Sequence, residues 1–296
     1  MQKISWPLIA VLVVLLIATI VVLNRPGESS RTASTGKYLV EYDSSVVDKI
    51  EITAGTSDIT LEKEAGVWKI TSPVQAKAEQ KTVESAVGRG TSLEISTPVS
   101  ANPEKQRLFL VDSSGPLVTF FARGTPAASV RIGKSGPTFT DTYIRLEGSD
   151  EVYLTQGLGN MFVRQINDWR DKTIFKTEAE FIKEVSFHFG DTTFALILQD
   201  SVWRIGAREA SEPAVRGFLS SLSNFMTDTF VDSMPAAVPP LTATITVAGT
   251  EIHFYRQDDG TKYYVQTSTS PQWFEIQQWR ANQLLKREKD FLPAST

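Results

Sequence analysis

A run of twenty residues near the N-terminus, Ile4 to Leu23, constrains this chain more than any other feature. It contains no charged residue and is interrupted only by Ser5, Trp6, Pro7 and Thr19. Twenty helical residues at about 1.5 Å each span roughly 30 Å, the thickness of a bilayer's hydrocarbon core. A buried helix of a soluble protein does not fit, because no face of the run is polar. The sequence therefore predicts a transmembrane anchor over residues 1–23.

A cleaved signal peptide is the alternative interpretation of this run. Its apolar core would normally be only about 7–15 residues and would end at a small-x-small cleavage site. The run instead ends in Val-Val-Leu-Asn-Arg-Pro. A short leader before an anchor usually stays inside the cell, so we expect the soluble part outside the cytoplasm. Residues 24–36 are rich in Ser, Thr, Gly and Pro, and predict a flexible tether.

Composition excludes several classes of partner and site. Apolar residues make up 41% and charged residues 22% of the chain, as in ordinary globular proteins. The net charge is -4 and there is no basic tract, so we expect no nucleic-acid partner. Cysteine is absent. Disulfides, zinc-thiolate sites, a thiol nucleophile and a lipidated cysteine are therefore all excluded.

The soluble part reads as one unit used twice. Residues 47–70 and 181–205 both show alternating apolar positions, a turn, a second alternating run and a Val-Trp-basic-Ile strand. This period of two, punctuated by Gly and Asp, is typical of antiparallel β-meanders. A helix candidate follows in each, over residues 79–93 and 211–226. Only the second has a clean apolar stripe and a capping Ser211, since Gly88 and Gly90 weaken the first.

Each unit closes with strands and a Trp-Arg helix, Trp169-Arg170 in the first and Trp279-Arg280 in the second. Three landmarks that recur in the same order indicate a duplication. The predicted fold is therefore α+β. One N-terminal transmembrane helix precedes two similar antiparallel β-meander units, each with a packed helix. The predicted boundaries are 37–175 for the first unit and 176–296 for the second.

Several segments together resemble the domain-of-unknown-function 4340 family. They are Val67–Val74, Ile132–Ser135, Tyr143–Leu146, Val152–Leu154 and Asp168–Lys172. The likeness covers most of residues 45 to 225, and the order and spacing of the segments carry it. It implies a membrane-anchored bacterial protein encoded beside ABC-type transporters of the gliding-motility kind. It supplies no catalytic residues, and the second Trp-Arg pair lacks the flanking Asp and Lys.

No stretch of the sequence predicts catalysis, a cofactor or a metal site. Ile132-Gly-Lys-Ser135 is not a phosphate loop, because Ala128 occupies the place of the first glycine and Gly136-Pro137 follows instead of a helix. His188 and His253 lie in aromatic, strand-like runs without a metal-binding pattern. The acids Asp112, Asp141 and Asp150-Glu151 lie in apparent turns, where carboxylates usually cap the backbone.

Tryptophan and arginine give the remaining candidates. Trp68 and Trp203 are interpreted as core residues packed between sheet and helix, and the alternative is a platform on which a sugar stacks. The cluster Asp168, Trp169, Arg170 and Asp171, and the pair Trp279 and Arg280, have two interpretations. One is a structural ion pair with cation–π packing, and the other is a surface for docking a partner.

We therefore expect a non-enzymatic accessory or scaffold subunit of a cell-envelope complex. The expected partners are ABC-type transporter subunits and, through residues 4–23, the lipid bilayer. The expected location is the bacterial inner membrane, with the soluble part on the extracytoplasmic side. The alternative is a membrane-tethered module that binds a glycan or another extracytoplasmic polymer.

Overall fold

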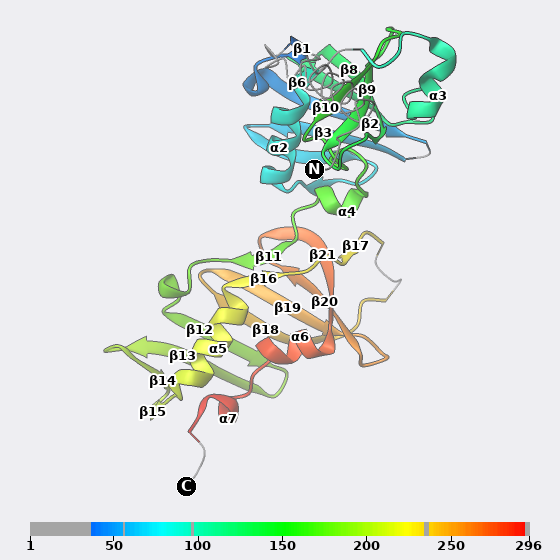
Figure 1. The fold of residues 1–296 in the computed structure, drawn as a ribbon. Helices are drawn as coiled ribbons and strands as arrows, with labels where there is room; N and C mark the ends of the chain where they lie inside the picture. Colours follow the sequence, from blue (N-terminus) through cyan, green and yellow to red (C-terminus); the bar gives the residue numbers. More distant parts are fainter. Residues whose placement is uncertain (1–36, 56, 96–97, 234–236, 294–296) are drawn as a thin grey trace, which may run out of the picture.

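The computed structural model describes residues 37–55, 57–95, 98–233 and 237–293. Figure 1 shows two β-rich units in succession, the first coloured blue to green and the second green to red. The predicted anchor, residues 1–23, and the predicted tether, residues 24–36, lie outside the described residues. Within the part of the chain that is described, no helix is both long and apolar enough to cross a membrane.

The predicted α+β fold class is wrong for the part of the chain that is described. Antiparallel sheets dominate the structure, which is 48% strand and 20% helix. Both predicted helices are shorter than expected: α2 (Gln80–Gly90) and α5 (Glu212–Leu222) have eleven residues each. The predicted apolar stripe of the second helix also included Phe225 and Met226, which belong to a strand. The two helices are therefore short elements packed against large sheets.

The first unit is built on a ten-stranded antiparallel sheet. From edge to edge its strands are β1 (Lys37–Glu41), β6 (Ser92–Ile95), β10 (Val152–Gln156), β9 (Asp141–Leu146), β8 (Thr125–Ser135), β7 (Leu117–Ala122), β2 (Val47–Ala54), β3 (Ser57–Glu64), β4 (Val67–Ser72) and β5 (Ala76–Lys77). Short helices in its connections are η1 (Ser44–Val46), η2 (Pro103–Lys105), α3 (Gln106–Phe109) and α4 (Ile166–Trp169).

The second unit is built on a nine-stranded antiparallel sheet. From edge to edge its strands are β15 (Arg208–Glu209), β14 (Val202–Ile205), β13 (Thr192–Gln199), β12 (Glu184–Phe189), β18 (Leu241–Val247), β19 (Thr250–Arg256), β20 (Lys262–Thr267), β21 (Ser270–Gln277) and β17 (Phe230–Val231). A separate two-stranded sheet pairs β11 (Thr173–Lys176) with β16 (Asn224–Met226). The remaining helices are η3 (Ala179–Phe181), α6 (Gln278–Leu284) and α7 (Glu288–Phe291).

The two large sheets share the order of eight strands. The meander β2 to β5 corresponds to β12 to β15, and the meander β7 to β10 corresponds to β18 to β21. The two meanders join in the same way, since β2 pairs with β7 as β12 pairs with β18. The strand that follows each long helix also pairs with the strand that precedes the first meander of its unit. In the first unit β6 pairs with β1, and in the second β16 pairs with β11.

Alternating apolar residues place one side of each sheet in a core. Ile50 of β2 lies opposite Leu61 of β3, and both are fully buried. In the second unit Phe187 of β12 lies opposite Phe194 of β13, with ring centroids 4.6 Å apart. Because side chains alternate across a strand, such pairs gather on one face and the polar residues between them face solvent. Each unit has its own hydrophobic cluster.

Gly90 shows why the first helix contains glycine. A Cβ atom at Gly90 would lie 2.1 Å from Cζ of Phe120, the buried aromatic of β7. Glycine costs about 1 kcal/mol in a helix, yet here it lets the last turn of α2 approach the sheet. Gly88 has open space around its Cα and no such contact. The feature that made this helix look poor in the sequence is thus partly a packing requirement.

Trp68 and Trp203 occupy equivalent strands but are not equally buried. Trp68 is 1% exposed, which confirms its predicted place in the core, whereas Trp203 is only partly buried at the margin of the second core. The helices differ accordingly. The side chain of Gln80, the first residue of α2, accepts from the Trp68 N–H (2.8 Å) and donates to the Trp68 carbonyl (2.9 Å). The first residue of α5, Glu212, pairs with Arg216 of its own helix instead.

Candidate functional site

The chain leaves the first unit through α4, and Trp169 fixes that exit. Trp169 is fully buried, and its ring centroid lies 6.4 Å from that of Phe162 in the first core. Asp168 closes the start of α4 by accepting a hydrogen bond from the N–H of Gln165 (3.2 Å). The guanidinium of Arg164 lies 5.8 Å from the Trp169 ring. The helix is therefore anchored by one large apolar side chain.

Arg170 follows at once and reaches into the second unit. Its Nη1 donates to Oδ2 of Asp232 (2.9 Å), and its Nη2 donates to Oδ1 of the same carboxylate (2.7 Å). Nη2 also donates to Oε1 of Gln272 (2.8 Å), and the guanidinium lies 3.9 Å from the ring centroid of Phe230. Arg170 is 1% exposed. A bidentate pair between a buried guanidinium and a carboxylate fixes orientation as well as distance.

Backbone hydrogen bonds mark the same crossing point. The carbonyl of Trp169 accepts from the N–H of Glu79 (2.8 Å), and the N–H of Asp171 donates to the carbonyl of Lys77 (2.9 Å). One residue later the carbonyl of Lys172 accepts from the N–H of Thr227, in the second unit (2.9 Å). The chain is thus tied to the first unit up to residue 171 and to the second from residue 172. The predicted boundary after residue 175 falls inside β11.

The ion pair and the cation–π contact expected around Trp169-Arg170 exist, but with other partners. Neither flanking acid contacts Arg170: Asp168 caps α4, and Asp171 accepts from the N–H of Thr173 (3.0 Å). The acid is Asp232, 62 residues further along the chain, and the aromatic ring is Phe230. Nothing in the local sequence could identify these partners, because both come from the strand-and-loop region between β16 and β18.

The second Trp-Arg pair has a different environment. Trp279 is 59% exposed, and the Arg280 guanidinium lies 5.9 Å from the Phe225 ring and 6.0 Å from Trp279. Arg280 lies within α6, whereas Arg170 is the extended residue that ends α4. The dipeptide recurs in the sequence without recurring in its contacts.

A cleft of about 760 Å³ lies beside the Arg170 contact, between the two units. Its walls come from the middle of β4, from β5 and β11, from β17 with the hairpin β20–β21, and from the first residue of β19. The lining residues are Lys69, Gln75–Lys77, Asp171, Thr173–Lys176, Phe230–Asp232, Thr250, Thr267 and Thr269–Phe274. A strand of each of the three sheets ends at this cleft, and β5 and β17 are terminal strands of the two large sheets.

The charged groups of the cleft are unevenly paired. Asp232 is held by Arg170, and Lys69 pairs with Glu64. Lys77 and Lys176 have no ion-pair partner among the described residues. Two partly buried aromatic rings, Phe230 and Trp273, add apolar surface. The cleft therefore combines apolar rings and hydroxyl groups with lysines that are free to meet an anion.

A smaller cavity of about 390 Å³ lies beside α4 and the start of α2. It is lined by Glu79, Thr82, Arg164, Asp168, Arg170 and Lys172. Three cationic and two acidic side chains surround it, so it is polar without a strong net charge. The buried Nε of Arg170 has no hydrogen-bond partner among the residues that the structure describes.

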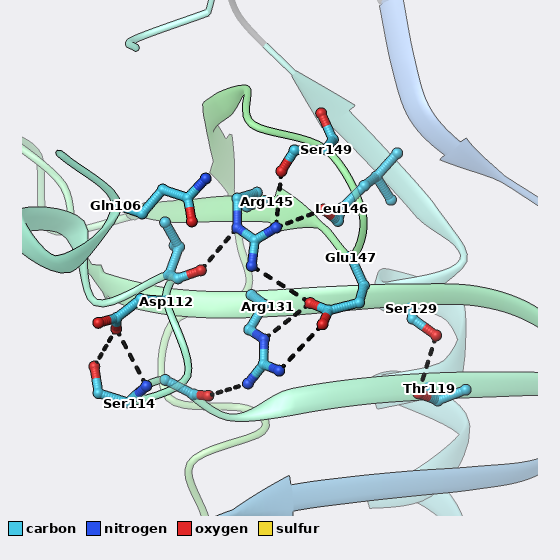
Figure 2. A network of polar contacts seen from close by, with 12 residues as sticks. Gln106, Asp112, Ser114, Thr119, Ser129, Arg131, Arg145, Leu146, Glu147 and Ser149 are labelled. Atoms are coloured by element: carbon cyan, nitrogen blue, oxygen red, sulfur yellow. Dashed lines mark hydrogen bonds and ion pairs between the residues drawn. The ribbon is translucent and has the colours of Figure 1, made fainter. Parts of the chain in front are cut away.

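A separate polar network of the first unit holds a loop in place (Figure 2). Arg145 donates to the carbonyls of Val111 (2.8 Å) and Ser149 (2.7 Å). Arg131 donates to both carboxylate oxygens of Glu147 (3.0 and 3.3 Å). Hydrogen bonding from Arg131, with the charges of both arginines, holds the pKa of the Glu147 carboxyl below its usual value. Every nitrogen of both guanidinium groups donates to a protein acceptor, so the network serves to hold the loop.

The other residues singled out in the sequence have structural roles. Lys134 and Ser135 end strand β8, so a phosphate loop is excluded by the backbone as well as by the pattern. His188 and His253 each contact a threonine hydroxyl on the neighbouring strand, at 2.8 and 3.2 Å. Asp112 caps its own turn by accepting from the Ser114 N–H (3.1 Å). In the described ranges no three His, Asp or Glu residues gather in a metal-binding arrangement.

One family model matches a region of the chain that includes parts of both units. The family model described as "Domain of unknown function (DUF4340)" matches residues 68–244. The chain belongs to this family. The match begins in β4 and ends in β18, so the DUF4340 region spans the junction and contains both Arg170 and Asp232. Gln272 lies outside it. No curated protein and no solved structure matches the chain.

Proposed function

We propose that this protein is a non-enzymatic accessory subunit of a cell-envelope complex, and that it holds its partner in the cleft between the two units. The observation that carries the proposal is the cleft itself, about 760 Å³ and lined from both units. Concave sites of this size at domain junctions are where proteins preferentially bind their ligands. Arg170 fixes the two walls relative to one another, which prepares the cleft before anything enters it.

The chemistry of the cleft supports binding without turnover. Asp232 accepts from Arg170 with both carboxylate oxygens, and one oxygen of Asp171 accepts from the Thr173 N–H. The remaining lysines, hydroxyl groups and aromatic rings can hold a partner by charge, hydrogen bonds and apolar contact.

The proposed partner is an ABC-type transporter in the bacterial inner membrane. The support is the transporter neighbourhood that the family resemblance implies. The apolar composition of residues 4–23, which lie outside the described residues, would keep the protein beside such a partner through contact with the bilayer. In this arrangement the cleft would lie on the extracytoplasmic side.

Affinity purification of the full-length chain in mild detergent tests the proposal. Transporter subunits should be retained by the natural sequence and lost with Thr269→Trp, which fills the cleft from an exposed turn. Gln283→Trp, on an exposed position of α6 away from the cleft, is the matched control and should retain them. A shortened chain starting at residue 36 should retain them more weakly. If the natural sequence purifies alone at near-physiological expression, the proposal is wrong.

A polymer-binding module is the second candidate, and one observation favours it. Trp273 and four hydroxyl side chains, Thr250, Thr267, Thr269 and Ser270, lie together along one wall of the cleft. An aromatic ring beside hydroxyl groups offers a saccharide both apolar contact and hydrogen bonds. Binding of isolated cell-wall glycan by the full-length protein, with no co-purifying subunit, would decide in favour of this candidate.

A further inference from the structure

The strands that line the cleft present their edges to it. Phe230, Val231 and Asp232 are consecutive, and all three line the cleft, as do the four consecutive residues Thr173–Lys176 of β11. Successive side chains of a strand point to opposite faces. Consecutive residues can therefore line one cavity only where the strand turns its edge, with its backbone, toward that cavity.

Two of these edges are open. β17 pairs only with β21, and β11 pairs only with β16, among the described strands. The third, β5, is partly covered, since Asp171 donates to the carbonyl of Lys77. An open edge carries unpaired N–H and C=O groups, which are a template for another extended chain. Peptides bind such edges by adding a strand, with affinity from the backbone and specificity from alternate side chains.

Charge selects which extended chain would fit. Lys77 and Lys176 face the cleft without an ion-pair partner in the described structure, in a chain whose net charge is -4. Lysines beside an open edge also discourage self-association of such edges. They repel a basic strand and attract an acidic one, so the same two side chains protect the edge and choose its partner.

We propose that the cleft binds an extended, acidic segment of a partner protein, which adds a strand to the open edge of β17. Its carboxylates lie toward Lys77 and Lys176, and its alternate, apolar side chains contact Phe230 and Trp273. This inference rests on the proposed function, because it takes the cleft as the site where the partner is held. It adds the partner's chemistry: an acidic peptide in β conformation, as distinct from a folded surface or a glycan.

A fluorescent nine-residue peptide of alternating glutamate and valine is the probe, added to the full-length protein in detergent. Binding is measured by anisotropy. The Lys77→Gln/Lys176→Gln variant should bind about tenfold more weakly, because two charge contacts are removed. The control variant, Lys105→Gln/Lys183→Gln, removes the same charge from exposed lysines outside the cleft and should bind as the natural sequence does.

Two modified probes separate strand addition from charge attraction. The peptide with lysine in place of glutamate should not bind measurably. A glutamate–valine peptide with N-methyl groups along one edge keeps every side chain but loses backbone donors on that edge. It should bind at least about fivefold more weakly if the peptide pairs as a strand. Equal binding of the methylated and unmethylated peptides would overturn the proposal.

Polygalacturonate, an anionic glycan, is the competing probe. If it binds with sensitivity to the Lys77/Lys176 change while the acidic peptide does not bind, the occupant is a glycan and the inference is wrong. The proposed function fails separately, by the purification described above. Subunits retained in a cleft-dependent way, with no binding of the acidic peptide, would refute the inference and leave the accessory role standing.

Discussion

Trp169-Arg170 and Trp279-Arg280 are the same dipeptide at the close of two units that share one topology. In the first, the tryptophan is fully buried and the arginine reaches the other unit at 2.7 and 2.9 Å. In the second, the tryptophan is 59% exposed and the arginine stays within its own unit, 5.9 Å from the Phe225 ring. The helices explain the difference. α4 ends at Trp169 and the chain leaves extended, whereas α6 continues past Arg280 to Leu284.

A repeated sequence motif can therefore preserve a local element without preserving its contacts. A side chain that ends a helix is aimed by the departing backbone, and one inside a helix is aimed along the helix surface. Arg170 also has Asp232, Gln272 and Phe230 opposite it. The junction contacts therefore depend on how the two units meet, not on the motif alone.

The largest contrast is expected at the tryptophans. Trp169→Ala should lower the free energy of unfolding by about 3–5 kcal/mol, because it empties a fully buried position in the first core. Trp279→Ala should change it by less than about 0.5 kcal/mol, as for an exposed surface residue. Urea denaturation of both variants measures the difference. Equal losses would show that the two motifs are equivalent after all.

The arginines should differ next most. Arg170→Met should cost about 2–3 kcal/mol, since it leaves the Asp232 carboxylate without its partner while that side chain keeps some access to water. Arg280→Met should cost less than about 1 kcal/mol, because it has no ion pair among the described residues. Asp232→Asn, made alone and in the Arg170→Met background, measures the coupling between the two side chains. If the losses of the two single variants add up to that of the double variant, the pair does not interact.

Trp68 and Trp203 test the same idea within matching strands. Trp68→Ala should cost about 3–5 kcal/mol and Trp203→Ala about 1–2 kcal/mol, since only Trp68 is fully enclosed. In a Gln80→Ala background the difference between the two losses should be smaller, because the hydrogen bonds that tie α2 to β4 at Trp68 are already removed. Thermal denaturation followed by tryptophan fluorescence gives all three values. A larger loss for Trp203→Ala than for Trp68→Ala would contradict the burial argument.

The smallest contrast is in pH dependence. Arg131 lowers the pKa of Glu147 in the first unit, so that pair's stabilisation is full above the ordinary carboxyl pKa and is lost as pH falls through the lowered value. Hydrogen bonding to Glu275 raises the pKa of Lys262 in the second unit, so that pair is lost as pH rises through the raised value. Glu147→Gln should therefore remove an acid-side effect and Lys262→Met an alkaline-side one. Stability measured across pH for each variant checks this, and an effect on the opposite side would refute the assignment.

Much of the strand pattern could be predicted from the sequence. Alternation around Ile50 and Phe187 gave the meanders, because a half-buried strand must alternate apolar and polar residues. The second helix was less accurate at its end. Phe225 and Met226 continue its apolar stripe, yet Ser223 ends the helix and both residues join β16 opposite β11. A strand partner from 50 residues earlier in the chain leaves no mark in the local period.

The candidate site could be predicted only in part. The sequence drew attention to Trp169 and Arg170 because two large, interaction-rich side chains adjoin at the end of a unit. It gave no indication of Asp232, Gln272, Phe230 or the cleft between the units. Flanking acids were the natural partners to expect. Instead, each accepts a hydrogen bond from a nearby backbone N–H, Asp168 at the start of α4 and Asp171 at the turn into β11.

By itself, the sequence determined the elements whose physics is local: the alternating strands, the core position of Trp68, the absence of cysteine chemistry and membership of the DUF4340 family. Tertiary structure alone decided how the meanders join into two large sheets, the different environments of the two Trp-Arg pairs and the cleft lined by strands of three sheets. The physical reason is range. Periodicity and capping act within a few residues, whereas a buried charge finds its partner, and a sheet finds its edge, only when distant segments are brought together.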